Sequence, residues 1–357
     1  MTRTVAHVFD YGGPTGGSFI PAMESLARAV GARGDRFVAI ATNVEGATWP
    51  AELKRTGATV HLIANGRDLA GALAYARPDI VHAHFTRYDL PVVRLAPWNA
   101  RIFWHVHSHR EDVSRAARTA AFLKYQIAGS RVEGIVAVSR TLAEECLAFA
   151  VPPRKLRVVQ NGIDTHVFHP PNIIERASAR REFGYRSDDR VVLFFERVPY
   201  KGGATVRAAM DLAPGLRILV AGGTAADREK YLDLPRARLT ARASDARQLY
   251  WAADALAFAS DNEAFGFVLA EALACGLPIA ASDIPIVREV CGDVESVKRF
   301  PPRDPAALAQ ALLAASEPGH RSDAGRRRVV ELFDLGRWTA EMLALYEIRS
   351  SARSRSY

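Results

Sequence analysis

Two glutamates in the segment SDNEAFGFVLAEALACGLP (260–278) stand among apolar residues. Glu263 precedes an Ala-Phe-Gly sequence, and Glu271 lies inside a run that is typical of a helix. On a helix, a side chain has as neighbours the residues three and four positions away. For Glu271 these neighbours are all apolar: Phe267, Val268, Ala274 and Cys275. A carboxylate on such a face needs a partner, which is either a polar ligand or a buried salt bridge.

The elements around these glutamates indicate a hydroxyl-bearing ligand. The run ALAFA (255–259) predicts a strand, Glu263 falls in the loop after it, and we expect a helix to begin near Phe265. Glu271 then lies ~7–8 Å along that helix at its usual rise. Carboxylates accept strong hydrogen bonds from diols, and the first N–H groups of a helix are free to donate. The two acids would therefore hold two different parts of one ligand.

Two cations follow the first strand of the second half of the chain, in FFERVPYKGG (194–203). Arg197 offers a planar fork of donors and Lys201 a compact point charge, and both stand before a glycine-rich helix start. This combination suits a diphosphate. Unrelated surface cations are the alternative interpretation.

A glycine-rich turn follows the first strand of the chain, in FDYGGPTGGSF (9–19). Glycine lets an anion approach the backbone N–H groups at a helix start, so Gly16 and Gly17 are candidate phosphate contacts. The spacing differs from GxGxxG, and no acid follows about 20 residues later as in dinucleotide-binding proteins. A purely structural turn remains an alternative.

Three histidines alternate along RIFWHVHSHR (101–110), at positions 105, 107 and 109, and share one face if the segment is extended. This pattern raises the alternative of a metal site, but no companion carboxylate motif supports zinc. We expect His107, at the end of the strand, to face the ligand site.

Short β-branched runs alternate with helical stretches along the whole chain, which predicts parallel sheets built from βαβ units. Two doubly wound halves follow, joined through the proline-containing and polar stretches 161–175 and 181–190. We place the first domain at residues 1–165 and the second at 166–334. An amphipathic helix over 335–350 is expected to pack back onto the first domain. In such sheets, ligands bind at the carboxyl ends of the strands.

Composition excludes several classes of protein. The 357 residues are 49% hydrophobic and 24% charged, and no apolar run approaches the ~20 residues of a membrane span. Three cysteines without metal-ligand spacing favour a reducing cytoplasm. The net charge of +8 comes from scattered arginines without a nucleic-acid motif, so we expect no nucleic-acid partner. Peripheral membrane contact stays open.

With these sites in view, the chain resembles the retaining glycosyltransferases of family 4 over essentially its whole length. The most specific shared feature is the E-x7-E signature in NEAFGFVLAEALACGLPIAASD (262–283). Supporting features are AVSRTLAEECLAFAVPPRKLRVVQNGIDTHVF (137–168), the R…KG loop that ends at Lys201–Gly202, and REVCGD (288–293). The resemblance implies the α/β GT-B fold, in which two Rossmann-like, doubly wound parallel-sheet domains face a central cleft.

The resemblance also implies roles for particular residues. Glu271 would hydrogen-bond the ribose of a nucleotide-sugar donor, and Glu263 would contact the transferred sugar. Arg197 and Lys201 would bind the diphosphate, and His107 is similar to the family's histidine near the anomeric carbon. The implied catalytic residues are His107, Arg197, Lys201 and Glu263. The implied donor-binding residues are Gly16, Gly17, Arg197, Lys201, Glu263, Ala264, Phe265, Gly266 and Glu271.

Two positions depart from the family pattern. Ala264 replaces a common glycine in E-G-F-G, and the Arg197-to-Lys201 spacing is short, with Glu196 directly before the arginine. No D-x-D pair is evident, which is consistent with a reaction that needs neither metal nor cofactor beyond the nucleotide-sugar. We expect the proton of the acceptor hydroxyl to pass to a phosphate oxygen, with retention of configuration.

Four further alternatives stay open at this point. The same fold serves phosphorylases and sugar-phosphate synthases, which differ in their co-substrate. A non-catalytic sugar-nucleotide binder and a Rossmann oxidoreductase are the other classes, and the absent GxGxxG disfavours the last. The expected acceptor is a small soluble molecule such as a sugar, an aminocyclitol or a natural-product aglycone, and the fourth alternative is a lipid-linked or cell-envelope acceptor.

Overall fold

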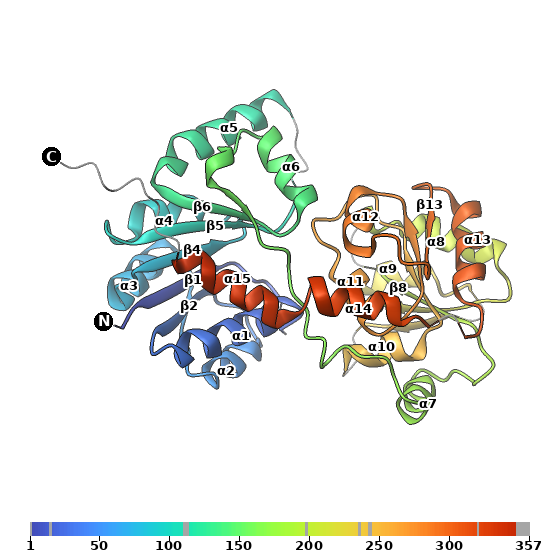
Figure 1. The fold of residues 1–357 in the computed structure, drawn as a ribbon. Coiled ribbons are helices and arrows are strands. Elements are labelled where there is room, and N and C mark those ends of the chain that lie inside the picture. The colour runs from blue at the N-terminus through green and yellow to red at the C-terminus, as the bar shows by residue number, and fades with distance from the viewer. Residues whose placement is uncertain are drawn as a thin grey trace. The chain divides into compact units, whose positions relative to one another are not determined.

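The computed structural model describes residues 2–13, 16–109, 114–196, 199–234, 237–241, 245–319 and 321–347. The chain divides into two compact units, shown in Figure 1. Unit 1 comprises Met1–Gly162 and Leu335–Tyr357, and unit 2 comprises Ile163–Asp334. Each unit is an α/β sandwich built on its own parallel sheet, so the parallel α/β architecture expected from the sequence is confirmed.

Unit 1 contains a seven-stranded sheet in the order β3-β2-β1-β4-β5-β6-β7, with every neighbouring pair parallel. The order reverses between β1 and β4, which makes that pair the switch point of the sheet. The strands are β1 (Thr4–Phe9), β2 (Arg36–Thr42), β3 (Thr59–Ile63), β4 (Ile80–His84), β5 (Arg101–Val106), β6 (Val132–Ala137) and β7 (Leu156–Val158).

The helices of unit 1 come from both ends of the chain. They are α1 (Phe19–Ala32), α2 (Trp49–Lys54), α3 (Gly66–Ala76), α4 (Asp89–Leu95), α5 (Arg115–Gln126), α6 (Arg140–Ala148) and α15 (Leu335–Glu347). Helix α15, drawn in red in Figure 1, packs against α1 and buries Trp338, Met342 and Tyr346 in the core beneath β1. The hydroxyls of Ser25 and Thr339 share a hydrogen bond of 2.8 Å between these two helices.

Unit 2 contains a six-stranded parallel sheet in the order β10-β9-β8-β11-β12-β13, whose switch point lies between β8 and β11. The strands are β8 (Val191–Phe195), β9 (Arg217–Ala221), β10 (Ala237–Thr240), β11 (Ala255–Phe258), β12 (Ile279–Ser282) and β13 (Val297–Phe300). The helices are α7 (Ile173–Glu182), α8 (Gly203–Leu212), α9 (Ala225–Glu229), α10 (Ala246–Ala252), α11 (Phe267–Ala274), α12 (Pro285–Cys291), α13 (Pro305–Ala315) and α14 (Asp323–Leu332).

Apolar side chains on alternate strand positions explain why α8 and α13 cover one face of this second sheet. Val192 and Phe194 of β8 form a core with Val206 of α8 and Leu308 and Leu312 of α13. Buried parallel strands read as near-continuous apolar runs, as VVLFF does here. Over the described ranges, no helix is both long enough and apolar enough to span a bilayer.

Candidate functional site

The loops that follow β8 and β11 bring two of the expected site residues together. These strands are neighbours, with Leu193 paired to Leu256. Lys201 lies in the loop after β8 and forms an ion pair with Glu263, which lies in the loop after β11. Both side chains are mostly buried, at 15% and 17% exposure. A cation and a carboxylate thus meet at the switch point of the second sheet, where α/β sheets bind their ligands.

Two glycines hold the start of α8 close to this pair. Gly202 has a φ of 76°, and a Cβ there would lie 2.2 Å from the carbonyl oxygen of Ala259. A Cβ at Gly203 would lie 2.3 Å from Oε2 of Glu196. Neither position accepts a larger residue without a shift of the backbone or of Glu196. Gly202 is therefore required by the close approach of the loop to Ala259, and Gly203 by the approach of Glu196.

Glu196, for which the sequence indicated no role, lies beneath the start of α8. It is buried and accepts a hydrogen bond of 2.5 Å from the hydroxyl of Tyr231. Burial, and then this bond and the nearby charge of Glu196, raise the pKa of Tyr231. Glu196 is thus a structural acid that supports the loop. Its partner is 35 residues away in sequence, so no local pattern pointed to it.

Helix α11 carries the second glutamate of the E-x7-E signature. Gly266 caps the helix with a φ of 80°, and the helix begins at Phe267, two residues later than expected. Glu271 is buried and accepts a hydrogen bond from the hydroxyl of Tyr250, which comes from α10. Burial and the neighbouring carboxylate raise the pKa of Tyr250 well above its ordinary value. The partner that Glu271 needs thus includes a tyrosine that sequence reasoning missed.

The residues between the two glutamates are also buried. Ala264 is 8% exposed and Phe265 is 2% exposed. The centroid of the Phe265 ring lies 5.3 Å from that of Phe267 and 5.6 Å from that of Phe333. The Phe265 side chain therefore anchors the loop in the core. What this segment can offer a ligand is its backbone, together with the first-turn N–H groups of α11.

The glycine-rich turn after β1 lies at the switch point of unit 1. Gly17 has a φ of 47°, and a Cβ there would lie 2.5 Å from the hydroxyl oxygen of Tyr11. The carbonyl oxygen of Gly16 accepts a hydrogen bond of 3.0 Å from the N–H of Ile20 in α1. The turn geometry and the approach of Tyr11 explain the glycine at position 17. Arg197, the remaining expected diphosphate ligand, lies outside the described residues.

The three alternating histidines do not act as one set. His105 and His107 share a sheet face with three further histidines, whereas His109 lies beyond the end of β5 and pairs with Glu145 of α6. Two groups of three histidines could each hold a metal ion, because within each group the ring nitrogens lie within 4.8 Å of one another. The first group is His7, His82 and His84, and the second is His84, His105 and His107. Burial lowers the pKa of His107 to about 3.

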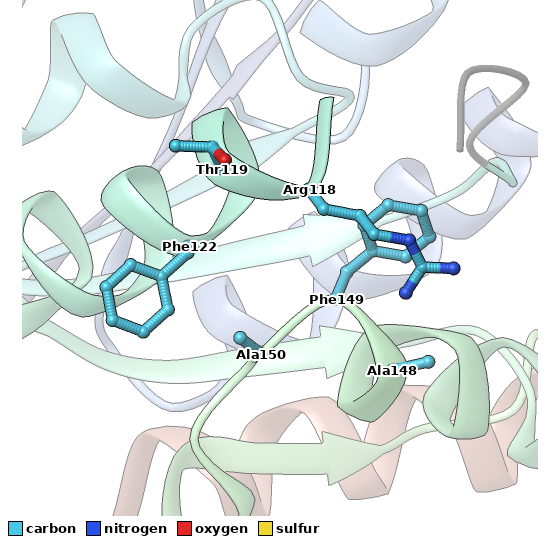
Figure 2. A pocket seen from close by; sticks show the side chains of 6 residues that line it. All are labelled: Arg118, Thr119, Phe122, Ala148, Phe149 and Ala150. Atoms are coloured by element: carbon cyan, nitrogen blue, oxygen red, sulfur yellow. The ribbon is translucent and has the colours of Figure 1, made fainter. Parts of the chain in front are cut away.

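A separate cavity of about 330 Å³ opens between α5 and α6 in unit 1. Figure 2 shows the Arg118 guanidinium lying over the Phe149 ring, 5.4 Å from its centroid. The cavity is lined by Arg118, Thr119, Phe122, Ala148, Phe149 and Ala150. Its walls are mostly apolar with one cation, and it contains none of the expected site residues.

Models of two glycosyltransferase families match the two units in turn. Glycosyltransferase Family 4 matches residues 22–167, and Glycosyl transferases group 1 matches residues 189–317, so that together they cover more than half of the chain. The chain belongs to the family 4 glycosyltransferases. The Lys201–Glu263 pair and α11 lie inside the second match, and His107 lies inside the first.

Relatives of this glycosyltransferase include proteins named D-inositol 3-phosphate glycosyltransferase. The protein from Mycobacteroides abscessus is 36% identical over 146 residues, which cover 37% of this chain and 32% of the relative. The protein from Xylanimonas cellulosilytica is 29% identical over 300 residues, which cover 75% of this chain and 71% of the relative. The first match thus spans about a third of that relative's length.

Solved structures of similar fold cover nearly the whole chain. A glycosyltransferase from Rickettsia africae has a TM-score of 0.83 at 18% identity, with 97% of this chain and 98% of that chain covered. The Anabaena protein HepE, solved with UDP and glucose, has a TM-score of 0.80 at 17% identity, with 98% and 100% covered. Sucrose-phosphate synthase from Thermosynechococcus elongatus has a TM-score of 0.77 at 22% identity, with 97% and 98% covered. The fold is GT-B.

Proposed function

We propose that this family 4 glycosyltransferase transfers a sugar, with retention of configuration, from a nucleoside diphosphate sugar to a hydroxyl of a small acceptor. The observation that carries the proposal is the Lys201–Glu263 ion pair at the switch point of unit 2. A cation suited to a diphosphate and a carboxylate suited to sugar hydroxyls lie in contact there. A nucleoside diphosphate sugar carries a diphosphate that the lysine can bind and sugar hydroxyls that the carboxylate can bind.

The proposed donor-binding roles are those that the resemblance to the family 4 glycosyltransferases implies. Lys201, with Arg197, neutralises the diphosphate, and Gly16 and Gly17 are candidate phosphate contacts. Glu263 and the backbone of Ala264, Phe265 and Gly266 hold the transferred sugar. Glu271 accepts hydrogen bonds from the donor ribose and is oriented by the hydroxyl of Tyr250. Residues 166–334 are then the donor domain and residues 1–165 the acceptor domain, with α15 packed on the latter.

The reaction follows from where charge develops. The bond between the anomeric carbon and the diphosphate oxygen breaks, and Lys201 stabilises the negative charge that grows on the leaving group. The acceptor oxygen bonds to the anomeric carbon on the same face, and its proton passes to an oxygen of the leaving phosphate. His107 contacts the sugar near the anomeric carbon. The proposed role of Glu263 is to bind hydroxyls, so the proposal assigns no side-chain nucleophile and requires no metal.

The names of relatives narrow the first substrates to test. HepE was solved with UDP and glucose, which makes a UDP-sugar the first donor to try. The D-inositol 3-phosphate glycosyltransferases make a phosphorylated cyclitol the first acceptor. The three cysteines are buried thiols outside any disulfide, which supports a reaction in the reducing cytoplasm.

One observation favours a second candidate, transfer to a lipid-linked acceptor. Helix α5 and the residue after it expose three large apolar side chains, Phe122 at 51%, Leu123 at 48% and Ile127 at 65%, and Phe122 lines the cavity of Figure 2. An apolar acceptor chain could lie on this surface. We favour the soluble acceptor because its proposed chemistry requires none of these contacts.

A donor and acceptor screen tests the function. The protein is heated with UDP-, GDP-, ADP- and dTDP-sugars, and a bound donor should raise the melting temperature by mass action. The stabilising donor is then incubated with inositol 3-phosphate, with inositol, and with a polyprenyl phosphate in vesicles, and the product is analysed by NMR. An axial donor bond that stays axial in the product supports retention. Absence of transfer or hydrolysis with every donor would contradict the proposal, and inversion would contradict the mechanism.

A further inference from the structure

Five imidazoles gather on one face of the sheet of unit 1. They come from three neighbouring strands, and the register pairs His7 with His82 and His84 with His105. The rings of His7, His82, His84 and His105 are at most 2% exposed, and His107, at the end of β5, is half-buried. Helix α15 covers this face and adds the hydroxyl of Tyr346. The proposed function uses only His107 of this cluster.

Four of the five rings form one continuous hydrogen-bonded chain. His107 Nε2 lies 3.0 Å from His84 Nδ1, and His84 Nε2 lies 2.8 Å from His7 Nδ1. The Tyr346 hydroxyl lies 3.0 Å from His7 Nε2 and 2.8 Å from His82 Nδ1. The ring centroids of His84 and His107 lie 5.2 Å apart, and those of His7 and His84 lie 5.0 Å apart. With nitrogen–nitrogen distances this short, the bonded rings meet edge to edge. The path from the half-buried end therefore runs His107, His84, His7, Tyr346, His82.

Such a chain couples the tautomers of its members. A neutral imidazole has one N–H donor and one acceptor nitrogen, and a hydroxyl donates once. If His107 donates from Nε2, then His84 and His7 must also donate from Nε2, and Tyr346 donates to His82 Nδ1. If the chain runs in the opposite direction, all four histidines carry the proton on Nδ1. His107, His84 and His7 thus share one tautomer, and His82 shares it too when the Tyr346 hydroxyl donates within the chain.

The rings stay neutral, and the inner end of the chain is closed. Burial lowers the pKa of His7 and His107 to about 3 and holds the pKa of His82 and His84 well below the ordinary value. In the part of the chain that the structure describes, no carboxylate bonds to any of these rings. His82 Nε2 has no partner there. A proton that entered at His107 would come to rest in the core, so the chain fixes a direction and does not conduct protons.

We propose that the buried chain behind His84 fixes His107 as the neutral Nε2–H tautomer, so that its Nδ1 faces a ligand as a hydrogen-bond acceptor. Nε2–H is the tautomer that a free neutral histidine side chain prefers, and this direction gives it to all four rings. A half-buried acceptor at the carboxyl end of β5 suits a hydroxyl of a sugar or of an acceptor. This consequence for catalysis rests on the proposed function. His84 is then a positioning residue that acts through His107.

A transition metal is the competing occupant of these nitrogens. His84 and His107 meet through nitrogens that are at hydrogen-bond distance, and one proton between them satisfies both. A divalent ion would need to displace that proton and would bring a charge into a core without a carboxylate partner. The chain explains the observed contacts without that charge, so metal binding becomes an outcome of the test.

Nitrogen-15 NMR of the full-length, histidine-labelled protein at pH 7.5 tests the proposal without any substrate. We expect His7, His82, His84 and His107 each to show a protonated Nε2 and an unprotonated Nδ1. In His84→Phe, Nε2–H of His107 loses its buried acceptor, and the proton should move to Nδ1, where solvent can accept it. His82, on the far side of Tyr346, should keep its tautomer.

His105→Phe is the matched control. His105 is equally buried and pairs with His84 across the strands, but neither of its ring nitrogens has a partner among the described residues, so the tautomer of His107 should not change. Circular dichroism verifies that both variants fold. A protonated Nδ1 on His107 in the wild type, mixed tautomers among the four rings, or an unchanged His107 in His84→Phe would overturn the proposal. One equivalent of zinc that is retained after dialysis and abolished by His84→Phe would overturn it as well.

Activity provides a separate readout. With a donor identified, His84→Phe should lower kcat/KM about tenfold through loss of one ligand hydrogen bond, while His105→Phe stays within about twofold. If the tautomers behave as stated and no sugar is transferred by the wild type, the proposed function fails and the tautomer chain stands. If transfer occurs and the tautomers are not coupled, only this inference fails.

Discussion

The hydroxyl of Tyr250 in α10 donates a hydrogen bond to the carboxylate of Glu271 in α11. Both side chains are buried, with Tyr250 fully enclosed and Glu271 at 6% exposure. A buried acid that accepts a bond from a neutral hydroxyl is held in one orientation while it keeps further lone pairs for other donors. This contact turns an apolar-flanked glutamate into an oriented acceptor.

Tyr250→Phe should therefore weaken both unit 2 and its donor site. Loss of a hydrogen bond to a buried carboxylate costs about 1–3 kcal/mol, measurable by urea denaturation. Donor affinity, measured by calorimetry, should fall about three- to tenfold because Glu271 is no longer oriented. Tyr185→Phe is the control, since its hydroxyl donates to the carbonyl of Ile218 in the same unit. If both variants bind the donor equally well, Tyr250 has no role beyond stability.

Lys201→Ala should affect turnover far more than folding. Its ammonium is paired with Glu263 and is proposed to stabilise the leaving diphosphate, and removal of one such electrostatic contact costs about 10²–10³ in kcat. Lys230→Ala removes an exposed lysine of unit 2 that pairs with Asp227, and should change kcat less than twofold. Steady-state kinetics compares the two, with melting curves as a check. Near-normal turnover in Lys201→Ala would exclude the diphosphate role.

Gly202→Ala tests whether the loop before α8 must approach β11 closely. The new Cβ would lie 2.2 Å from the carbonyl oxygen of Ala259, and the φ of 76° disfavours any residue with a side chain. We expect a loss of about 1–3 kcal/mol in the free energy of unfolding, and weaker donor binding. Gly215→Ala is the matched control because its Cβ would meet nothing within 4 Å. Equal stability of the two variants would show that the loop moves away at little cost.

Most of the fold could be predicted from the sequence because buried parallel strands are short apolar runs with little ambiguity. VVLFF and RILVA are such runs and form β8 and β9, and the strand expected over 255–259 is present as β11. Helix starts were less accurate. Helix α11 begins at Phe267 and not near Phe265, because Gly266 takes a left-handed conformation that the sequence pattern does not specify.

The site was predictable where its residues are close in sequence. The spacing of Glu263 and Glu271 and the Lys201–Gly202 step are local patterns, and the structure places Lys201 against Glu263. Tyr250 and Tyr231 were missed because each reaches its acid from a separate helix or turn. Tertiary contacts of this kind produce no periodic pattern in the amino-acid sequence. The roles of the expected site residues in catalysis remain predictions.

The clearest pH effect should arise from the buried histidines of unit 1. The pKa of His7 and of His107 is lowered to about 3 by burial, whereas an unfolded histidine titrates near 6.5. Between these values the unfolded chain binds more protons than the folded one, so stability falls as the pH drops below about 6.5. Each such histidine contributes a slope of about 1.4 kcal/mol per pH unit in that window.

His105→Phe should remove the contribution of one histidine to this slope without breaking a hydrogen bond, because neither ring nitrogen of His105 has a partner in the described ranges. Burial holds the pKa of His105 well below its ordinary value. We expect stability equal to or above that of the wild type at pH 7.5, and an advantage that grows by about 1.4 kcal/mol per pH unit from pH 6 to pH 5. Hydrogen exchange of the β4 and β5 peptides at several pH values measures this advantage.

His166→Ala, at an exposed histidine of unit 2, is the control and should leave the exchange of these peptides unchanged. A loss of stability at pH 7.5 would mean that His105 has a ligand of its own, such as a metal ion or a buried water.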